Sequence, residues 1–457
     1  MRAMLKTILL LAWPAMVEQF LQTIVQYADT AMVGQLGVQA TASVGLTSTV
    51  TWLTNSPMWA MGTGVLAVIA RAVGAKDDRR TRSAAMSGIW LALIVGTAML
   101  VITELCAPHL PGWLGADESI RRPGSLYFAI ICAPMLFRAL SMMMGSALRA
   151  SGDTRTPMRV NLGMNLINVV LNFLLIFPTR TLTMLGAAFT MPGAGWGVIG
   201  AAIATAISMV FSGAFMLVKV LKSPVLSPLK LSARWDPPVI RECVRIGLPV
   251  AVQNLGVFSG HVVFASLVTS LGSTALATHS IALTAEQLFY IPGYGMQAAT
   301  STLCGIALGR RDEEELGRVS RTALLIAMGL MTLTGAALFA FPAAMMGLFT
   351  HDPDVIAGGA VVLRIVACSE PLYAAMIIFE GVFHGVGQTK YPFVVSLVTM
   401  WGVRVLGTLI CVRVIGLGLP AVWLCMVGDN VTRAMLLGIR YARGKWKREL
   451  GIGMSNE

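Results

Sequence analysis

Long apolar segments follow one another from the first residues of this 457-residue chain almost to its end. A helix needs about 20 predominantly apolar residues to cross a bilayer, and twelve segments reach roughly that length. Hydrophobic residues make up 56% of the chain and charged residues only 12%, whereas soluble domains carry about 25% charged residues. A transmembrane β-barrel would show short segments of alternating hydrophobicity instead. The sequence therefore predicts an all-α polytopic membrane protein.

The apolar segments divide the chain into two groups of six. The expected spans are residues 7–36, 43–71, 84–107, 122–149, 157–178, 195–220, 239–270, 276–308, 320–349, 355–386, 392–415 and 420–442. Two Ser-Pro steps and a Pro-Pro pair at 221–238 indicate a linker rather than a helix. The predicted organisation is an N-terminal six-helix bundle at 1–220, a cytoplasmic linker at 221–238, a C-terminal bundle at 239–443 and a cytoplasmic tail at 444–457.

Basic residues are distributed unevenly between the two sides of the predicted membrane. They cluster after the even-numbered spans, at 71–82, 149–159, 219–234, 310–321 and 440–448, and are sparse after the odd-numbered ones. By the positive-inside rule, the even-numbered exits and both termini lie in the cytoplasm, which predicts a multi-pass protein of the cytoplasmic (inner) membrane. Because topology explains the net charge of +12, we expect no nucleic-acid partner.

The two halves of the chain repeat one another. Landmarks of the first half recur in the second half at one constant offset, which pairs Pro14 with Pro249, Pro57 with Pro292, Gly74 with Gly309, and Gly-x-Thr-x-x-Pro at 152–157 with the same motif at 387–392. Six spans is an even number, so the second copy begins on the same side of the membrane as the first. The expected architecture is two six-helix bundles related by a pseudo-two-fold axis along the membrane normal, as in some secondary transporters.

The first span carries acids that a membrane helix rarely tolerates. Glu18, Gln22 and Asp29 fall at i, i+4 and i+11, which at about 100° per residue puts them on one helical face. A carboxylate at bilayer depth costs about 2.5–3.5 kcal/mol, so it usually faces protein or water. Pro14, one turn before Glu18, removes a backbone hydrogen bond and should bend this helix. It is either a hinge or a static kink.

Several stretches together resemble the multidrug and toxic compound extrusion (MATE) transporters. The matching pieces are LAWPAMVEQFLQTIVQYADTAMVGQLG in the first span, GSALRASGDTRTPMRVNLGMNLINVVLNFLLIF across the fourth and fifth, GAGWGVIGAAIAT in the sixth, AEQLFYIPGYGMQAATSTLCGIALG in the eighth and WLCMVGDNVTRAMLLGIRYARGKWK at the end. The resemblance covers nearly the whole chain. It implies two six-helix bundles around a central cavity, and export of organic, often cationic, compounds in exchange for Na⁺ or H⁺.

The fifth span adds a polar stripe, with asparagines at i, i+4, i+7 and i+11 from residue 161. Asp29, Asn168, Asn172 and Thr205 can offer one carboxylate and three neutral oxygens, which suit a hard cation such as Na⁺, and a carboxyl in low dielectric can also carry a proton. These positions match the N-terminal-bundle motif of one branch of the family, except that Asn172 replaces an acid found in some relatives. We assign this set and Glu18 to cation coupling. Interhelical hydrogen bonding is the structural alternative.

A second acidic site is predicted around Glu286 in the eighth span, with Gln22, Gln26, Tyr290 and His279 as candidate substrate contacts. The alternatives are that Glu286 pairs with Arg404 or Arg433 and that His279 is a hydrogen-bonded packing residue. Asp429 and Arg433, at i and i+4, are expected to pair with each other. Glu370 and Glu380 are weaker candidates for this site.

The predicted function is a cation-coupled (H⁺ or Na⁺) antiporter that exports organic, cationic or amphipathic compounds such as drugs by alternating access. A flippase for a lipid-linked precursor is the alternative, because Arg138, Arg364 and Arg404 could bind a pyrophosphate. The sequence has no GxxxxGK[ST] motif, so we expect no nucleotide and no cofactor beyond the coupling ion. Nor do clustered histidines and acids suggest an enzyme or a metal site other than Na⁺ at Asp29. The seven scattered cysteines are interpreted as buried small hydrophobes, and we expect a monomer.

Overall fold

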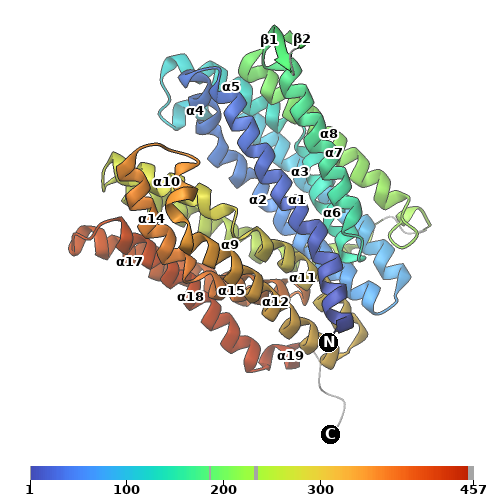
Figure 1. Cartoon of the computed structure of the whole chain (residues 1–457). Coiled ribbons are helices and arrows are strands. Elements are labelled where there is room, and N and C mark those ends of the chain that lie inside the picture. The colour runs from blue at the N-terminus through green and yellow to red at the C-terminus, as the bar shows by residue number, and fades with distance from the viewer. Residues whose placement is uncertain (1, 185–186, 231–234, 451–457) are drawn as a thin grey trace. The chain divides into compact units, whose positions relative to one another are not determined.

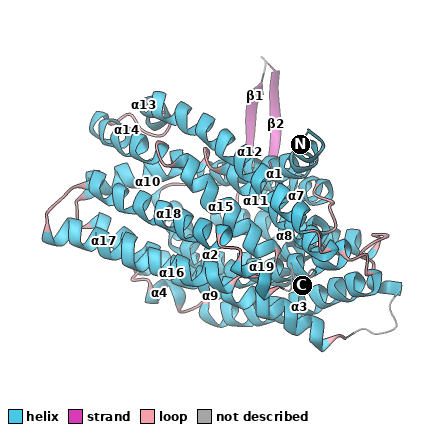
Figure 2. Ribbon diagram, turned by 90° about the horizontal axis from the view of Figure 1, so that it is seen from below, coloured by secondary structure: helices cyan, strands magenta, loops and turns pink. Residues whose placement is uncertain are grey.

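Helices account for nearly all of the structure, a computed structural model that describes every residue except 1, 185–186, 231–234 and 451–457 (Figure 2). Each of the twelve predicted spans is helical. Within the described residues, nine helices are long and apolar enough to cross a membrane, or eleven when each of two bent pairs is counted as one span. The remaining predicted span, 276–308, is occupied by two helices, Ser273–Gln287 and Ile291–Arg310, that are not in this count.

The chain divides into two compact units. Unit 1 contains Met1–Met16, Ala70–Asp77 and Arg245–Glu457, and unit 2 contains Val17–Ile69 and Asp78–Val244. The helix α1 passes from unit 1 to unit 2 two residues after Pro14, and α2 and α9 also pass between the units. The domain boundaries at 220 and 239 stay a prediction.

Unit 2 holds most of the helices up to α8 (Figure 1). Their bounds are α1 Arg2–Gly34, α2 Val38–Gly74, α3 Asp78–Cys106, α4 Leu110–Trp113, α5 Glu118–Cys132, α6 Met135–Ala150, α7 Arg155–Leu175 and α8 Gly197–Leu221. Between α7 and α8 the strands β1 (Pro178–Met184) and β2 (Ala187–Ala194) pair antiparallel, which the apolar pattern does not indicate. The 3₁₀ turn Pro228–Lys230 lies in the predicted linker.

Close helix packing in unit 2 places α7 and α8 beside each other and α8 against α6. Gly213 makes the second contact possible, because a Cβ there would lie 2.2 Å from the backbone oxygen of Phe137. Next to it, the hydroxyls of Ser141 and Ser212 are 2.7 Å apart. The polar faces of α7 and α8 are therefore held in fixed positions.

Unit 1 contains the second set of helices. They are α9 Pro237–Thr269, α10 Ser273–Gln287, α11 Ile291–Arg310, α12 Glu313–Ala340, α13 Pro342–Gly347, α14 Pro353–Ala367, α15 Glu370–Gly385, α16 Lys390–Thr399, α17 Leu406–Leu409, α18 Leu419–Ala442 and α19 Lys445–Glu449. The π-helical segments η2 (Met400–Val405) and η3 (Ile410–Val414) flank α17. The helices α11, α12, α15 and α18 pack around a core that includes Met296, Met331 and Phe383.

Prolines explain why four predicted spans are interrupted. The second helix of each pair begins beside Pro134, Pro292, Pro342 or Pro371. Proline is tolerated at the first helical position because the missing N–H has no intrahelical partner there. The two sharpest bends, of 44° and 54°, lie between α5 and α6 and between α14 and α15. Pro14 and Pro249, by contrast, lie inside continuous helices.

Candidate cation site

The second half of α1 has an apolar face that is exposed and a polar face turned towards protein. Phe20 is 48% and Ile24 43% exposed, whereas Glu18 and Asp29 contact other helices of unit 2. At about 100° per residue the two faces point in roughly opposite directions. This inverted arrangement suits a helix whose outer face meets lipid, and it directs both acids inward.

The helix α7 has the same inverted pattern. Its four asparagines, Asn161, Asn165, Asn168 and Asn172, are at most 8% exposed, while Leu166 on the opposite face is 64% exposed. Amides are buried in proteins when they find hydrogen-bond partners. Here most of the partners are side chains of α1 and α8.

Asp29 lies in a cluster of amides and a hydroxyl. Asn172 donates from Nδ2 to Asp29 Oδ1 at 2.6 Å and to Asn168 Oδ1 at 3.1 Å. Asn168 in turn donates to the hydroxyl of Thr205 on α8 at 3.3 Å. The structure thus brings together the four residues assigned to the core of the coupling site. On one side of the cluster, Met32 and Val33 of α1 pack with apolar residues of α7 and α8.

Among the described residues, the hydrogen bonds around Asp29 leave one amide oxygen without a donor. Asn172 Oδ1 is buried and has no hydrogen-bond partner within the described ranges. With the O and N of the Asn168 amide exchanged, both amide atoms have suitable partners, and Nδ2 donates to Asp29 Oδ1 at 3.0 Å and to Oδ2 at 3.3 Å. A buried amide oxygen without a donor and the neighbouring carboxylate are groups that a proton or a hard cation can bind.

Glu18 belongs to a different network. Its Oε1 accepts from Asn161 Nδ2 at 2.6 Å and lies 3.7 Å from a guanidinium nitrogen of Arg149. Ser212 completes the network by donating to Asn161 Oδ1 at 3.2 Å. Glu18 is eleven residues from Asp29, about 16 Å along a helix. It is therefore compensated locally by a positive charge, which Asp29 lacks in its hydrogen-bonded cluster.

The internal repeat shows which of these contacts the fold needs. Glu18 and Asn161 are 143 residues apart, and so are Gln253 and Ser396, their counterparts in the second repeat, which also hydrogen-bond each other, at 3.1 Å. The two helix pairs are therefore equivalent. Further along the same helices the two repeats differ: the second repeat has Phe264 at the position of Asp29, and Val403 and Gly407 at the positions of Asn168 and Asn172. Helices of this arrangement can therefore pack without an acid and amides at these positions.

In unit 1 the strongest charge cluster is centred on Asp429, which is fully buried. Arg404 Nε lies 2.9 Å from Asp429 Oδ2, and Arg433 donates to the same carboxylate at 3.0 and 3.2 Å. Arg404 also donates to Asn430 at 3.1 Å. The expected pairing of Asp429 with Arg433 is confirmed, and both arginines considered as partners of Glu286 are paired with Asp429.

Glu286 and Glu370 are the other buried acids of unit 1. Glu370 is fully buried, and neither of its carboxyl oxygens has a partner in the part of the chain that the structure describes. Glu286, 5% exposed, is close enough to interact electrostatically with Glu370 and Arg404. The sequence singles out Glu286 but gives Glu370 little weight, because nothing in the pattern indicates that its carboxyl is left without a partner.

The remaining predicted contacts are in separate places. His279 is buried edge-on against Phe264 and Trp423, and Tyr290 packs with the rings of Tyr294 and Tyr373 in unit 1. In unit 2, Gln22 is half-buried and Gln26 is exposed. The structure thus places His279 and Tyr290 in one unit and the two glutamines in the other.

Comparison with known proteins identifies the family. The MatE family model matches residues 14–174 and 249–410, more than half of the chain. The two matches start at Pro14 and Pro249, which are also the first pair of landmarks in the internal repeat. The chain belongs to the MatE family.

Several MatE relatives cover the chain almost completely. It is 28% identical to a probable multidrug resistance protein NorM of Thermotoga maritima over 97% of this chain and 93% of the relative. Among solved structures it resembles a MOP superfamily transporter of Pyrococcus furiosus (TM-score 0.89, 23% identity, 98% and 97% covered). A MATE family transporter in an outward-facing conformation is also similar (TM-score 0.87, 24% identity, 97% of each chain).

Membership of the MatE family confirms the predicted fold class and excludes an enzyme. The solved MATE structures have twelve helices in two bundles, and the all-α polytopic prediction agrees with them. MatE proteins are transporters, so the chain is a multi-pass membrane transporter for small molecules.

Proposed function

We propose that this chain is a cation-coupled antiporter that exports organic, cationic or amphipathic compounds across the cytoplasmic membrane by alternating access. Its NorM relative is described as a probable multidrug resistance protein, which supports drugs as the substrate class. The observation that carries the coupling proposal is Asp29, a carboxylate in a membrane helix held by Asn172, beside a buried amide oxygen that lacks a partner among the described residues.

Asp29 binds the coupling ion, H⁺ or Na⁺. Asn168, Asn172 and Thr205 supply neutral oxygens for Na⁺, or position the carboxyl for a proton. Glu18, already compensated by Arg149, keeps α1 against α7. Neutralising Asp29 removes the cost of a buried negative charge, so the conformation that shields Asp29 from water becomes more stable. A ligand shifts a conformational equilibrium only by such differential affinity.

The helix α1 transmits this change. It begins in unit 1, contains Pro14 and carries Asp29 in unit 2. A change in the position of Asp29 therefore acts on a helix that is covalently part of both units. Pro14 lacks the N–H that would hydrogen-bond the preceding turn, which makes it the hinge of this movement.

One coupling ion is sufficient for useful export. A single charge moving through 100 mV releases about 2.3 kcal/mol. At about 1.4 kcal/mol per decade, that energy sustains a roughly 50-fold gradient of a neutral compound. Glu286 and Glu370 in unit 1 are a second place for a proton or cation, since a carboxyl without hydrogen-bond partners is stable when neutralised.

We further propose that both termini are cytoplasmic, that the transporter is a monomer, and that Gln22, Gln26, Tyr290 and His279 contact substrate.

The flippase alternative needs arginines that are available to a pyrophosphate. Arg404 is paired with Asp429 and Asn430, Arg138 donates to Asn55 at 2.8 Å, and Arg364 is exposed. The ion pair of Arg404 favours the antiporter, because the charge of this buried arginine is already compensated by Asp429 and is not free for a pyrophosphate.

Efflux from proteoliposomes tests the proposal. Purified protein is reconstituted with a fluorescent organic cation inside, and a pH gradient and a Na⁺ gradient are imposed separately. We expect at least one of the two gradients to accelerate efflux of the fluorescent cation above the rate measured without a gradient. Efflux that neither gradient accelerates would reject the antiporter. Transbilayer movement of a fluorescent lipid pyrophosphate without cation efflux would favour the flippase.

A further inference from the structure

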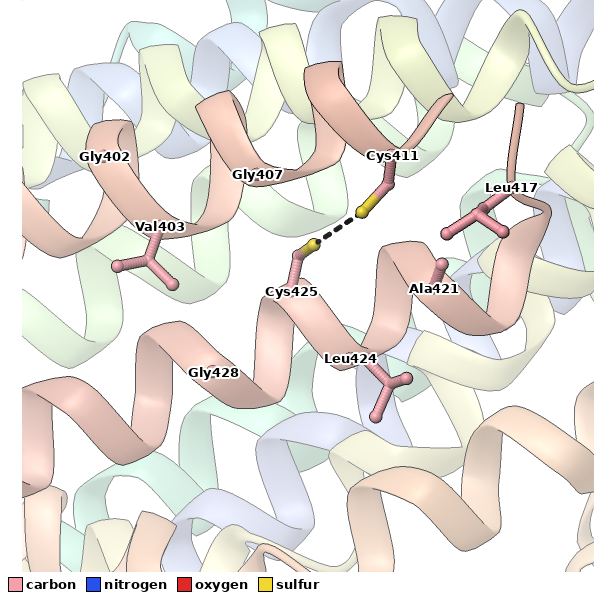
Figure 3. Close-up of a pocket in the computed structure, with 9 residues that line it drawn as sticks. All are labelled: Gly402, Val403, Gly407, Cys411, Leu417, Ala421, Leu424, Cys425 and Gly428. Carbon is pink, nitrogen blue, oxygen red and sulfur yellow. Dashed lines mark hydrogen bonds between the residues drawn. The ribbon is translucent and has the colours of Figure 1, made fainter. Parts of the chain in front are cut away.

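Two cysteines that are distant from the candidate cation site lie side by side in unit 1. Cys411 is in the π-helical segment η3 and Cys425 is in α18, and their sulfurs are 3.8 Å apart (Figure 3). Both are half-buried. The sequence gives no sign of this pair, because the spacing between the two cysteines matches no recognised motif.

The two helices approach closely at this point because small residues line their contact. Gly407 on α17 has so little space that a Cβ there would lie 3.3 Å from the sulfur of Cys425. Beside the pair is a groove of about 500 Å³ lined by Gly402, Gly407, Ala421 and Gly428 together with apolar side chains. The thiols are therefore next to one another and open to small reagents.

We propose that Cys411 and Cys425 form an intramolecular disulfide, a modification site that rests on the proposed membrane orientation but not on the proposed coupling ion. An S–S bond is about 2.05 Å long, so each sulfur has to move by only about 0.9 Å. The two thiols release two protons and two electrons as the bond forms. A dithiol-oxidising protein, whose own disulfide becomes two thiols, accepts them.

The location of the pair suits such an oxidant. Cys411 lies three residues before the end of η3, about 5 Å along a helix, and the segment 415–418 joins η3 to α18. In the proposed orientation this connection is outside the cytoplasm, where disulfides form and persist.

The bond would reinforce an existing contact between the same two segments. Arg404 and Cys411 are seven residues apart on one segment, and Asp429 and Cys425 are four apart on the other, so the ion pair and the thiols join the same faces. With both in place, the π-helical segments η2 and η3 are held against α18 at two points. The bond closes the short loop 411–425, which restricts the unfolded chain.

Peptide mapping tests the pairing. Full-length protein in detergent is treated with diamide, which accepts two electrons and two protons, or with a reductant, and is then alkylated with N-ethylmaleimide and digested. We expect a peptide linking Cys411 to Cys425 after oxidation, lighter by two hydrogen atoms than its parts, and alkylation of both cysteines after reduction. The pair should already be bonded in protein whose thiols are alkylated in intact cells before lysis.

Matched variants identify the pair. Cys411→Ser and Cys425→Ala should each abolish the linked peptide, whereas Cys368→Ser, at an exposed cysteine, should leave it unchanged. Oxidised wild type should melt about 5 °C above the reduced protein, and either variant should melt at one temperature under both conditions. If diamide leaves both cysteines alkylatable in folded wild type, or if the link joins a different pair or two molecules, the inference is wrong. Full alkylation in intact cells would overturn the placement of the oxidant.

Discussion

Replacing Asp29 with asparagine tests the coupling site with little change in shape. The variant keeps an oxygen that can accept the 2.6 Å hydrogen bond from Asn172. A hydrogen bond to a charged group contributes about 1.5–3 kcal/mol and a neutral one about 0.5–1.5 kcal/mol, so the folded state should lose about 1 kcal/mol. The variant nevertheless has no charge that an ion could neutralise.

The loss of coupling has a calculable size. In one-for-one exchange of a monovalent cation for a cationic substrate no net charge moves. A tenfold gradient of the driving ion, about 1.4 kcal/mol, then supports about a tenfold gradient of substrate. In proteoliposomes we expect the wild type to approach that ratio and Asp29→Asn to stay near equal concentrations on the two sides.

Two further variants make this test specific. Asp29→Asn combined with Asn172→Asp moves the carboxylate across a 2.6 Å contact onto α7, and should restore part of the gradient. Glu104→Gln, an acid of α3 that has no part in the proposed mechanism, should behave as the wild type. A full tenfold substrate gradient in folded Asp29→Asn would refute the assignment of Asp29.

Three other outcomes follow from the contacts. Asn172→Ala removes the donor to Asp29 and an oxygen ligand, which should weaken ion binding by about 1–2 kcal/mol and raise the ion concentration for half-maximal efflux about tenfold. An unchanged concentration dependence would exclude Asn172 from the site. Asp429→Asn leaves Arg404 and Arg433 buried without their shared carboxylate, so the free energy of unfolding should fall by about 3–5 kcal/mol and the melting temperature should fall markedly. An unchanged melting temperature would contradict the structural role given to this cluster. Pro14→Ala should slow efflux several-fold without changing the ion concentration for half-maximal efflux, and Pro249→Ala, at the equivalent position of the second repeat, should slow efflux less. Equal effects of the two variants would show that Pro14 is a static kink.

The sequence predicts the architecture well because a bilayer restricts the choice of structure. Three features can be read directly from the sequence: the length of the apolar segments, the constant offset between the two repeats and the positions of the basic loops. The interruptions beside Pro134 and Pro371 could also be anticipated from proline chemistry. The β1–β2 hairpin and the π-helical segments could not, because they depend on backbone pairing and packing rather than on hydrophobic periodicity.

The candidate site can be predicted from the sequence only where helical periodicity determines which way a side chain points. The shared faces of Asp29 and the asparagine stripe follow from spacing, and the structure places them in contact. Which asparagine meets which acid depends on the register of α1 against α7, which the sequence does not specify. For the same reason Glu18 is grouped with Asp29 by spacing but contacts Arg149 and Asn161 in space. The missing partners of Glu370 depend on packing in three dimensions.

Infrared difference spectroscopy of the purified transporter tests the central claim most directly. Spectra are recorded as the pH is lowered, and as Na⁺ is added, for the wild type and for Asp29→Asn. The coupling proposal predicts a carboxyl band that changes with at least one of these ions in the wild type and is missing in the variant. The same band with the same ion dependence in Asp29→Asn would show that the ion binds elsewhere.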